Sequence, residues 1–167
     1  MVRKPNIVDL LITNLFAMQS TALKLQAVID EHVAALHELN KEEIAYKPSP
    51  TKWSKKEIIG HLVDSAQSNI RRFIVAQYED KPHIVYNQDK WVVISDYQNY
   101  DVSEVINLWY LLNKQIVVIL KKMPQEMSKR ECLTQSLHTI EWLAEDYIKH
   151  LKHHLHQVLD LEPVAYP

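Results

Sequence analysis

Apolar side chains recur every three or four residues along four stretches of the chain, and this spacing is typical of amphipathic helices. The pattern predicts helices over approximately these residues: 7–39, 54–78, 101–123 and 139–159. Ser20–Thr21 is a candidate break or kink in the first of them. The second has a defined beginning, because Ser54 and Glu57 have the spacing of a capping box, in which each side chain satisfies a backbone amide.

Polar connections separate these helices. Residues 40–53 contain two prolines and are interpreted as a loop. Residues 79–100 are expected to contain one short helix, and a connection of this length in a compact domain often serves function. A second polar connection reaches about His138. Four amphipathic helices with two longer connections predict an all-α protein, a four-helix bundle forming one domain over residues 1–167.

The glycine content excludes several classes of site. Average usage of about 7% would give roughly twelve glycines, whereas Gly60 is the only one in the chain. Phosphate-binding loops, dinucleotide fingerprints and the nucleophile elbow of serine hydrolases all need several glycines. Tight hairpins also favour glycine, so its scarcity indicates helices. Gly60 itself has two interpretations. It either permits another backbone to approach closely near a site, or it is a neutral substitution that the helix tolerates at a cost in stability of about 1 kcal/mol relative to alanine.

Charge and hydropathy exclude several classes of binding partner. The net charge of −2 provides no basic field for nucleic acid or anionic lipid. No stretch of about 18 apolar residues is present, and the amino-terminal residues lack the pattern of a signal peptide, so no membrane span is expected and the cytoplasm is the expected compartment. The single cysteine, Cys132, excludes an internal disulfide and a cysteine-rich zinc site.

Four of the nine histidines fall within residues 150–156 of the last predicted helix. If His150 is set at 0° on a helical wheel, the apolar arc extends from roughly 20° to 160° and His154 lies at about 40°, inside it. His153 lies near −60° and His156 near −120°, outside the arc. His150 and His154 therefore face the bundle interior one turn apart, close enough for their imidazoles to share one metal ion.

A third ligand is expected from another helix, because two ligands rarely hold a metal well. His61 is the best candidate, since it interrupts an inward-facing apolar run of the second helix, and Asp64 could orient a ligand ring by accepting its second N–H. The alternative stays open at this point: a single inward histidine is more often a hydrogen-bonded core residue than a ligand.

Three short blocks resemble the DinB superfamily, and within it the YfiT-like metal-dependent hydrolases. Trp53–Ser65 resembles the family's helix-two signature, which ends in a metal histidine. Asn87–Trp91 resembles the loop before the third helix, and His150–Gln157 resembles the helix-four signature. The resemblance covers about residues 25–158. It implies metal-ligand roles for His61, His150 and His154 and a bundle in up-down-down-up order.

The resemblance also implies chemistry. Members of the family are often dimeric and bind divalent ions such as Zn²⁺ or Ni²⁺, and some transfer low-molecular-weight thiols to electrophiles or isomerise thiol adducts. We therefore expect a homodimer with one divalent transition-metal ion and a small-molecule substrate, such as a low-molecular-weight thiol. Three neutral imidazoles leave a coordination position open, so the expected nucleophile is a metal-bound water or thiolate rather than a protein side chain. Hydrolysis and thiol S-transfer both remain open.

Other residues are secondary candidates for the pocket or the ligand surroundings. Arg71, or its neighbour Arg72, could bind an anionic cosubstrate, although a solvated arginine is the simpler interpretation. Trp91 is a candidate pocket wall, Gln157 a candidate support for the ligands, and His153 the main rival to His150 or His154. The alternative function is a non-catalytic helical module that binds a ligand or partner and holds a structural or vestigial metal.

Overall fold

Four long helices pack with their apolar faces together in a computed structural model that describes residues 17–166. The helices are α2 (Ala17–His37), α4 (Lys55–Val75), α6 (Val102–Lys122) and α7 (Ile140–Val158). The predicted all-α four-helix bundle is therefore confirmed. None of the helices in the described part of the chain combines the length and the apolar composition that a bilayer crossing requires.

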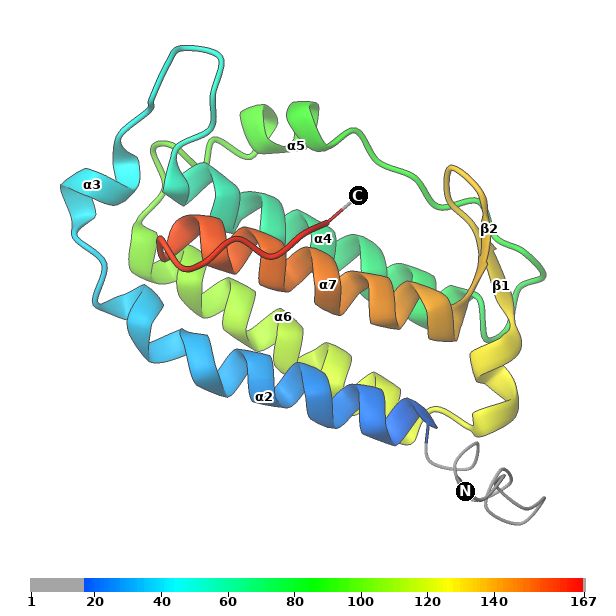
Figure 1. Cartoon of the computed structure of the whole chain (residues 1–167). Helices are drawn as coiled ribbons and strands as arrows, with labels where there is room; N and C mark the ends of the chain where they lie inside the picture. Colours follow the sequence, from blue (N-terminus) through cyan, green and yellow to red (C-terminus); the bar gives the residue numbers. More distant parts are fainter. Residues whose placement is uncertain (1–16, 167) are drawn as a thin grey trace.

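The helices run in up-down-down-up order (Figure 1). Helices α4 and α6 are parallel neighbours, so the chain between them must return along the whole length of the bundle. Helix α7 packs beside α4 with the opposite direction. This geometry explains the long polar connection between α4 and α6, and it confirms the short helix predicted there, which is α5 (Gln88–Ile94).

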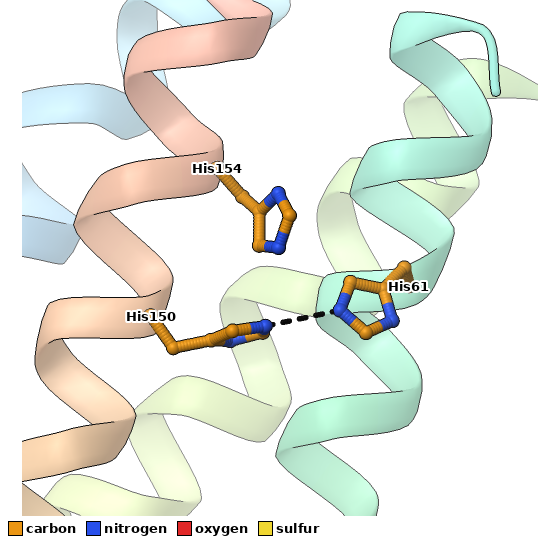
Figure 2. A group of neighbouring side chains, drawn as sticks. All are labelled: His61, His150 and His154. Carbon is orange, nitrogen blue, oxygen red and sulfur yellow. Dashed lines mark hydrogen bonds between the residues drawn. The ribbon is translucent and has the colours of Figure 1, made fainter. Parts of the chain in front are cut away.

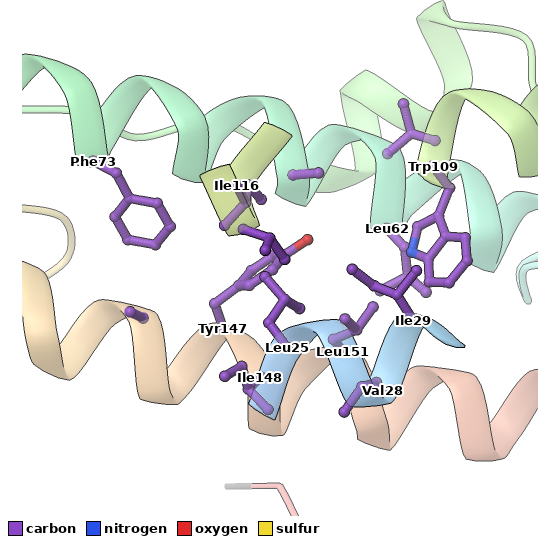
Figure 3. Packing of buried hydrophobic residues seen from close by; sticks show 14 of the residues in the cluster. Leu25, Val28, Ile29, Leu62, Phe73, Trp109, Ile116, Tyr147, Ile148 and Leu151 are labelled. Carbon is purple, nitrogen blue, oxygen red and sulfur yellow. The ribbon is translucent and has the colours of Figure 1, made fainter. Parts of the chain in front are cut away.

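The core lies between the four helices (Figure 3). Leu25 of α2, Leu62 of α4, Trp109 of α6 and Leu151 of α7 are all completely buried. Each buried side chain of this size contributes about 1.5–3 kcal/mol relative to an exposed one. The core therefore fixes the rotation of α4 and α7 about their axes, and with it the direction of the polar side chains beside it.

Side-chain caps set the helix beginnings that the sequence predicts. The Ser54 hydroxyl accepts from the Glu57 amide, and the Glu57 carboxylate accepts from the Ser54 amide at 2.8 Å, so the capping box is confirmed. Asp101 caps α6, and Thr139 caps α7 by accepting from the Trp142 amide. These local bonds satisfy amides that have no partner within the helix.

The first helix differs from its prediction in two ways. No break occurs at Ser20–Thr21, because the Thr21 hydroxyl bonds locally to the Ala17 carbonyl and to Glu145 of α7, which holds this turn in the helix. The helix ends at His37, and residues 7–16 of the prediction lie outside the described residues. The expected loop over residues 40–53 also contains a short helix, α3 (Lys41–Ala45).

The connection before α7 contains structure that the sequence did not predict. A 3-10 helix, η1 (Gln125–Lys129), leads into an antiparallel hairpin of β1 (Glu131–Leu133) and β2 (Leu137–Thr139). The scarcity of glycine was therefore a wrong argument against a hairpin. The turn of this hairpin contains no glycine and is stabilised by Thr134, because both its amide and its hydroxyl donate to the Ser136 carbonyl.

Candidate metal centre

Three histidines converge where the first half of α4 faces the second half of α7 (Figure 2). One ring nitrogen from each of His61, His150 and His154 lies within 4.8 Å of the others. The Nε2 atoms of His61 and His150 are 3.0 Å apart, and the three rings meet edge to face. The antiparallel packing of α4 and α7 brings together residues that are 89 positions apart in the sequence.

Burial favours the neutral form of these rings. Burial, together with a smaller effect of the neighbouring histidines, lowers the pKa of His61 to about 4 and that of His150 to about 2. Burial also lowers the pKa of His154, although a hydrogen bond with Gln157 acts in the opposite direction. A neutral imidazole has the free lone pair that a metal ion requires. The cluster is therefore already in its ligating protonation state at neutral pH.

A chain of hydrogen bonds fixes which nitrogen of His154 is free. His153 Nδ1 lies 2.7 Å from the Val164 carbonyl, so it donates, and its Nε2 accepts from the Gln157 side-chain amide at 2.9 Å. The Gln157 carbonyl oxygen then accepts from His154 Nδ1 at 2.8 Å. The network assigns the proton of His154 to Nδ1 and leaves Nε2 unprotonated. It also occupies both nitrogens of His153, the rival ligand.

Asp64 does not orient a ligand ring in the way that the sequence suggested. Its Oδ1 accepts from the Tyr97 hydroxyl at 2.6 Å. Among the described residues, neither Asp64 Oδ2 nor the Nδ1 atoms of His61 and His150 have a hydrogen-bond partner. Burial raises the pKa of Asp64 to about 6, although the bond from Tyr97 lowers it. Asp64 therefore connects α4 to the long connection rather than to the histidines.

A pocket of about 440 Å³ lies beside the histidine cluster, between α4 and α7. His150 and His154 line it, together with side chains from α4, from the long connection and from the segment after α7: Ser65, Asn69, Arg72, Tyr86, Gln88 and Tyr166. The Tyr166 ring packs edge to face against His150, with 5.3 Å between ring centroids. Its hydroxyl donates to Asp146 at 3.0 Å.

Two predicted pocket residues lie elsewhere. Arg71 is exposed, and Arg72 lines the pocket instead, because one residue along a helix rotates the side chain by about 100°. Trp91 is about one-third exposed and packs against the ring of Tyr86, the residue that lines the pocket itself. Gln157 contacts His154 from outside this pocket.

Tyr86 and Tyr166 were missed by sequence reasoning. Tyr86 belongs to the polar cluster of the long connection, which marks the segment but not the residue. Tyr166 gives no signal, because it follows the last periodic stretch and depends on the chain turning back along α7 (Figure 1). Two hydrogen bonds hold that returning segment against α7: His156 donates to the Glu162 carbonyl, and His153 donates to the Val164 carbonyl.

The donor set fits a divalent transition metal. Three neutral imidazole nitrogens from two helices suit zinc or nickel, which favour nitrogen ligands. Three such ligands would leave at least one coordination position for a substrate or water, as in catalytic rather than closed structural sites. The side chains thus define a helical bundle with a candidate three-histidine metal centre.

Comparison with known proteins identifies the family. The family model of the DinB superfamily matches residues 24–158, and the chain belongs to this superfamily. A curated relative from Bacillus subtilis (strain 168), named "Putative metal-dependent hydrolase YfiT", is 25% identical over 113 residues. That alignment covers 65% of this chain and 64% of the relative's length.

The solved structure of YfiT from Bacillus subtilis, described as a probable metal-dependent hydrolase with an unusual four-helix bundle topology, shares this fold. The superposition has a TM-score of 0.68 at 19% sequence identity and covers 96% of this chain and 90% of the other. At this identity the likeness supports the fold and its helix order.

Proposed function

We propose that the chain binds one divalent transition-metal ion, Zn²⁺ or Ni²⁺, through His61, His150 and His154, and that it is a metal-dependent enzyme acting on small molecules. The observation that carries this proposal is the convergence of three neutral imidazoles beside a pocket that two of them, His150 and His154, line. The description of the relatives as metal-dependent hydrolases supports it.

When bound, such an ion supplies Lewis-acid chemistry, which lowers the pKa of a water or a thiol at neutral pH. The protein's own contribution is to hold the three rings. The close packing of α4 against α7 sets the distance between His61 and His150, and Gln157 holds His154 with its Nε2 free. Trp53 packs against the His61 ring, with 5.1 Å between centroids, and shields it from solvent.

Hydrolysis and thiol S-transfer are the two reactions that this site would support. The names of the relatives favour hydrolysis. The resemblance to the DinB superfamily supports the second reaction, the transfer of a low-molecular-weight thiol to an electrophile. Both reactions use the same open position and the same pocket, so one set of variants tests both.

The test is metal analysis of protein purified without a histidine tag, followed by assays for ester hydrolysis and for thiol conjugation to electrophiles. We expect about one equivalent of metal per chain in the wild type and a loss of metal and activity in His154→Ala. His156→Ala is the matched control, because His156 lies on the same helix and bonds to the Glu162 carbonyl, away from the hydrogen bonds that hold His154. It should retain the metal.

Absence of stoichiometric metal in the wild type, or unchanged metal in His154→Ala, would overturn the metal-binding proposal. Metal binding without turnover, with a loss of stability on chelation as the main effect, would instead identify a non-catalytic module with a structural ion.

A further inference from the structure

Four polar side chains follow one face of α4 away from the histidine cluster. His61, Ser65, Asn69 and Arg72 are separated by four, four and three residues, the spacing of a single helical face. The last three line the pocket. Along the helix axis Arg72 lies about 16 Å beyond His61 at 1.5 Å per residue. Arg72 lines the same pocket as His150 and His154.

Arg72 is a cation that forms no ion pair in the described part of the chain. Its Nε and Nη2 donate to the Ile84 carbonyl, each at 3.2 Å, and its Nη1 donates to the Asn69 side-chain oxygen at 3.3 Å. A guanidinium has five N–H groups, so these bonds hold its plane and leave two N–H groups unassigned. No carboxylate within residues 17–166 forms an ion pair with it.

The surroundings of Arg72 favour an anion. The side chain is half-buried, and burial lowers its pKa by more than Tyr86, Cys132, Asp146 and Tyr166 together raise it. The one acidic residue that lines the pocket, Asp146, accepts from the Tyr166 hydroxyl. A planar fork of N–H donors matches the geometry of a carboxylate or a phosphate, and charge-assisted bonds of this kind are stronger than neutral ones.

We propose that Arg72 is the specificity-determining residue of this site, and that the substrate is a small molecule with an anionic carboxylate or phosphate group. Arg72 binds that group, and the reacting end of the molecule lies at the three histidines. This assignment rests on the function proposed above. A purely structural role, in which Arg72 only fastens the long connection through Ile84, would give no preference for an anionic ligand.

The test uses probes that bind the metal whatever the reaction is. Alkyl hydroxamates with two to five methylene groups carry a terminal carboxylate, a terminal phosphonate or, as the neutral control, a terminal primary amide. Binding to the metal-loaded wild type is measured by calorimetry. At one or more chain lengths we expect a charged probe to bind about tenfold or more tightly than its amide, given the strength of charge-assisted bonds. The carboxylate and phosphonate arms identify the group preferred.

Arg72→Gln should abolish this preference, while Arg71→Gln should keep it. The second variant is a matched control, since it removes the same charge from the adjacent, exposed position. Equal binding of charged and amide probes by the wild type would overturn the proposal, and this comparison needs no variant to fold. A preference that persists in folded Arg72→Gln would also overturn it, because the charge of the metal would then be its source.

Failure of this inference is distinguishable from failure of the proposed function. If the amide probes bind as tightly as the charged probes, the metal-binding proposal is supported and the proposed role of Arg72 is wrong. If the protein cannot be loaded with metal and no hydroxamate binds, both proposals fall.

Discussion

The ring of Tyr97 occupies the space that a Cβ atom on Gly60 would need. A methyl group built on Gly60 would clash with Cβ, Cγ and Cδ2 of Tyr97, while the Tyr97 hydroxyl donates to Asp64 one turn further along α4. The single glycine therefore permits a close approach, as one interpretation of the sequence suggested, but by a side chain instead of a backbone. It lies directly before the candidate ligand His61.

Gly60→Ala is therefore expected to destabilise the protein. Alanine at an unconstrained helix position would stabilise it by about 1 kcal/mol, whereas overpacking of a core typically costs about 1–3 kcal/mol. The free energy of unfolding, measured by urea denaturation, should fall. In a double-mutant cycle, Tyr97→Ala should remove most of the penalty of Gly60→Ala. A stabilised Gly60→Ala protein would show that the glycine is tolerated drift.

Gln157→Leu is expected to weaken metal binding without removing a ligand. The substitution keeps the side-chain volume but deprives His154 Nδ1 of its acceptor, and loss of such a partner typically costs about 10–100-fold in metal affinity. Affinity is measured by competition with a chromophoric chelator. Gln157→Glu retains an acceptor and should bind more tightly than Gln157→Leu. Gln19→Leu, at an exposed position on α2, is the control and should match the wild type.

The charge of Glu57 is expected to make stability depend on pH in mild acid. Burial acts to raise the pKa of Glu57, but hydrogen bonds from Lys47 and the Ser54 amide outweigh it, so the pKa in the folded protein lies below 4.5. The stabilisation is complete above the unfolded-state pKa near 4.5 and is lost as pH falls through the lower folded-state value.

Glu57→Gln tests this charge, because glutamine keeps the capping geometry but cannot pair with Lys47. The variant should be less stable than the wild type by about 1.5–3 kcal/mol at pH 7, the usual worth of a hydrogen bond to a charged group. The difference, followed by urea denaturation, should shrink below pH 4.5. Glu38→Gln, at an exposed position, should follow the wild type across the range. A constant difference at every pH would contradict the assignment.

Tyr166→Ala is expected to accelerate release of the metal to a chelator. The Tyr166 ring packs on His150 and forms part of the pocket wall, so its removal should open a path to the histidines. Stopped-flow measurement of metal transfer to a coloured chelator gives the rate. Tyr78→Ala, which removes an exposed tyrosine after α4, is the control. Equal rates in both variants would mean that Tyr166 does not limit access.

Much of the bundle could be predicted because the governing interactions are local. The capping box of Ser54 and Glu57 and the caps at Asp101 and Thr139 lie within four residues of the amides that they satisfy, so the sequence alone locates these helix beginnings. The side of α7 that carries His150 and His154 follows from helical periodicity, which needs no knowledge of a partner helix. Two predictions failed for different reasons. The expected break at Thr21 is absent because its hydroxyl bonds to Glu145 of another helix, and the hairpin was not expected because Thr134, and not glycine, stabilises its turn.

Periodicity and capping act within a few residues, so the amino-acid sequence was enough to predict four amphipathic helices and the inward direction of His150 and His154. Three relationships became visible only in the folded chain: the 3.0 Å between the Nε2 atoms of His61 and His150, the place of Arg72 rather than Arg71 in the pocket wall, and the Tyr97 ring in the space over Gly60. These relationships depend on the rotation and register of one helix against another. That rotation is set by packing of the whole core, a sum over many distant contacts that no short stretch of sequence contains.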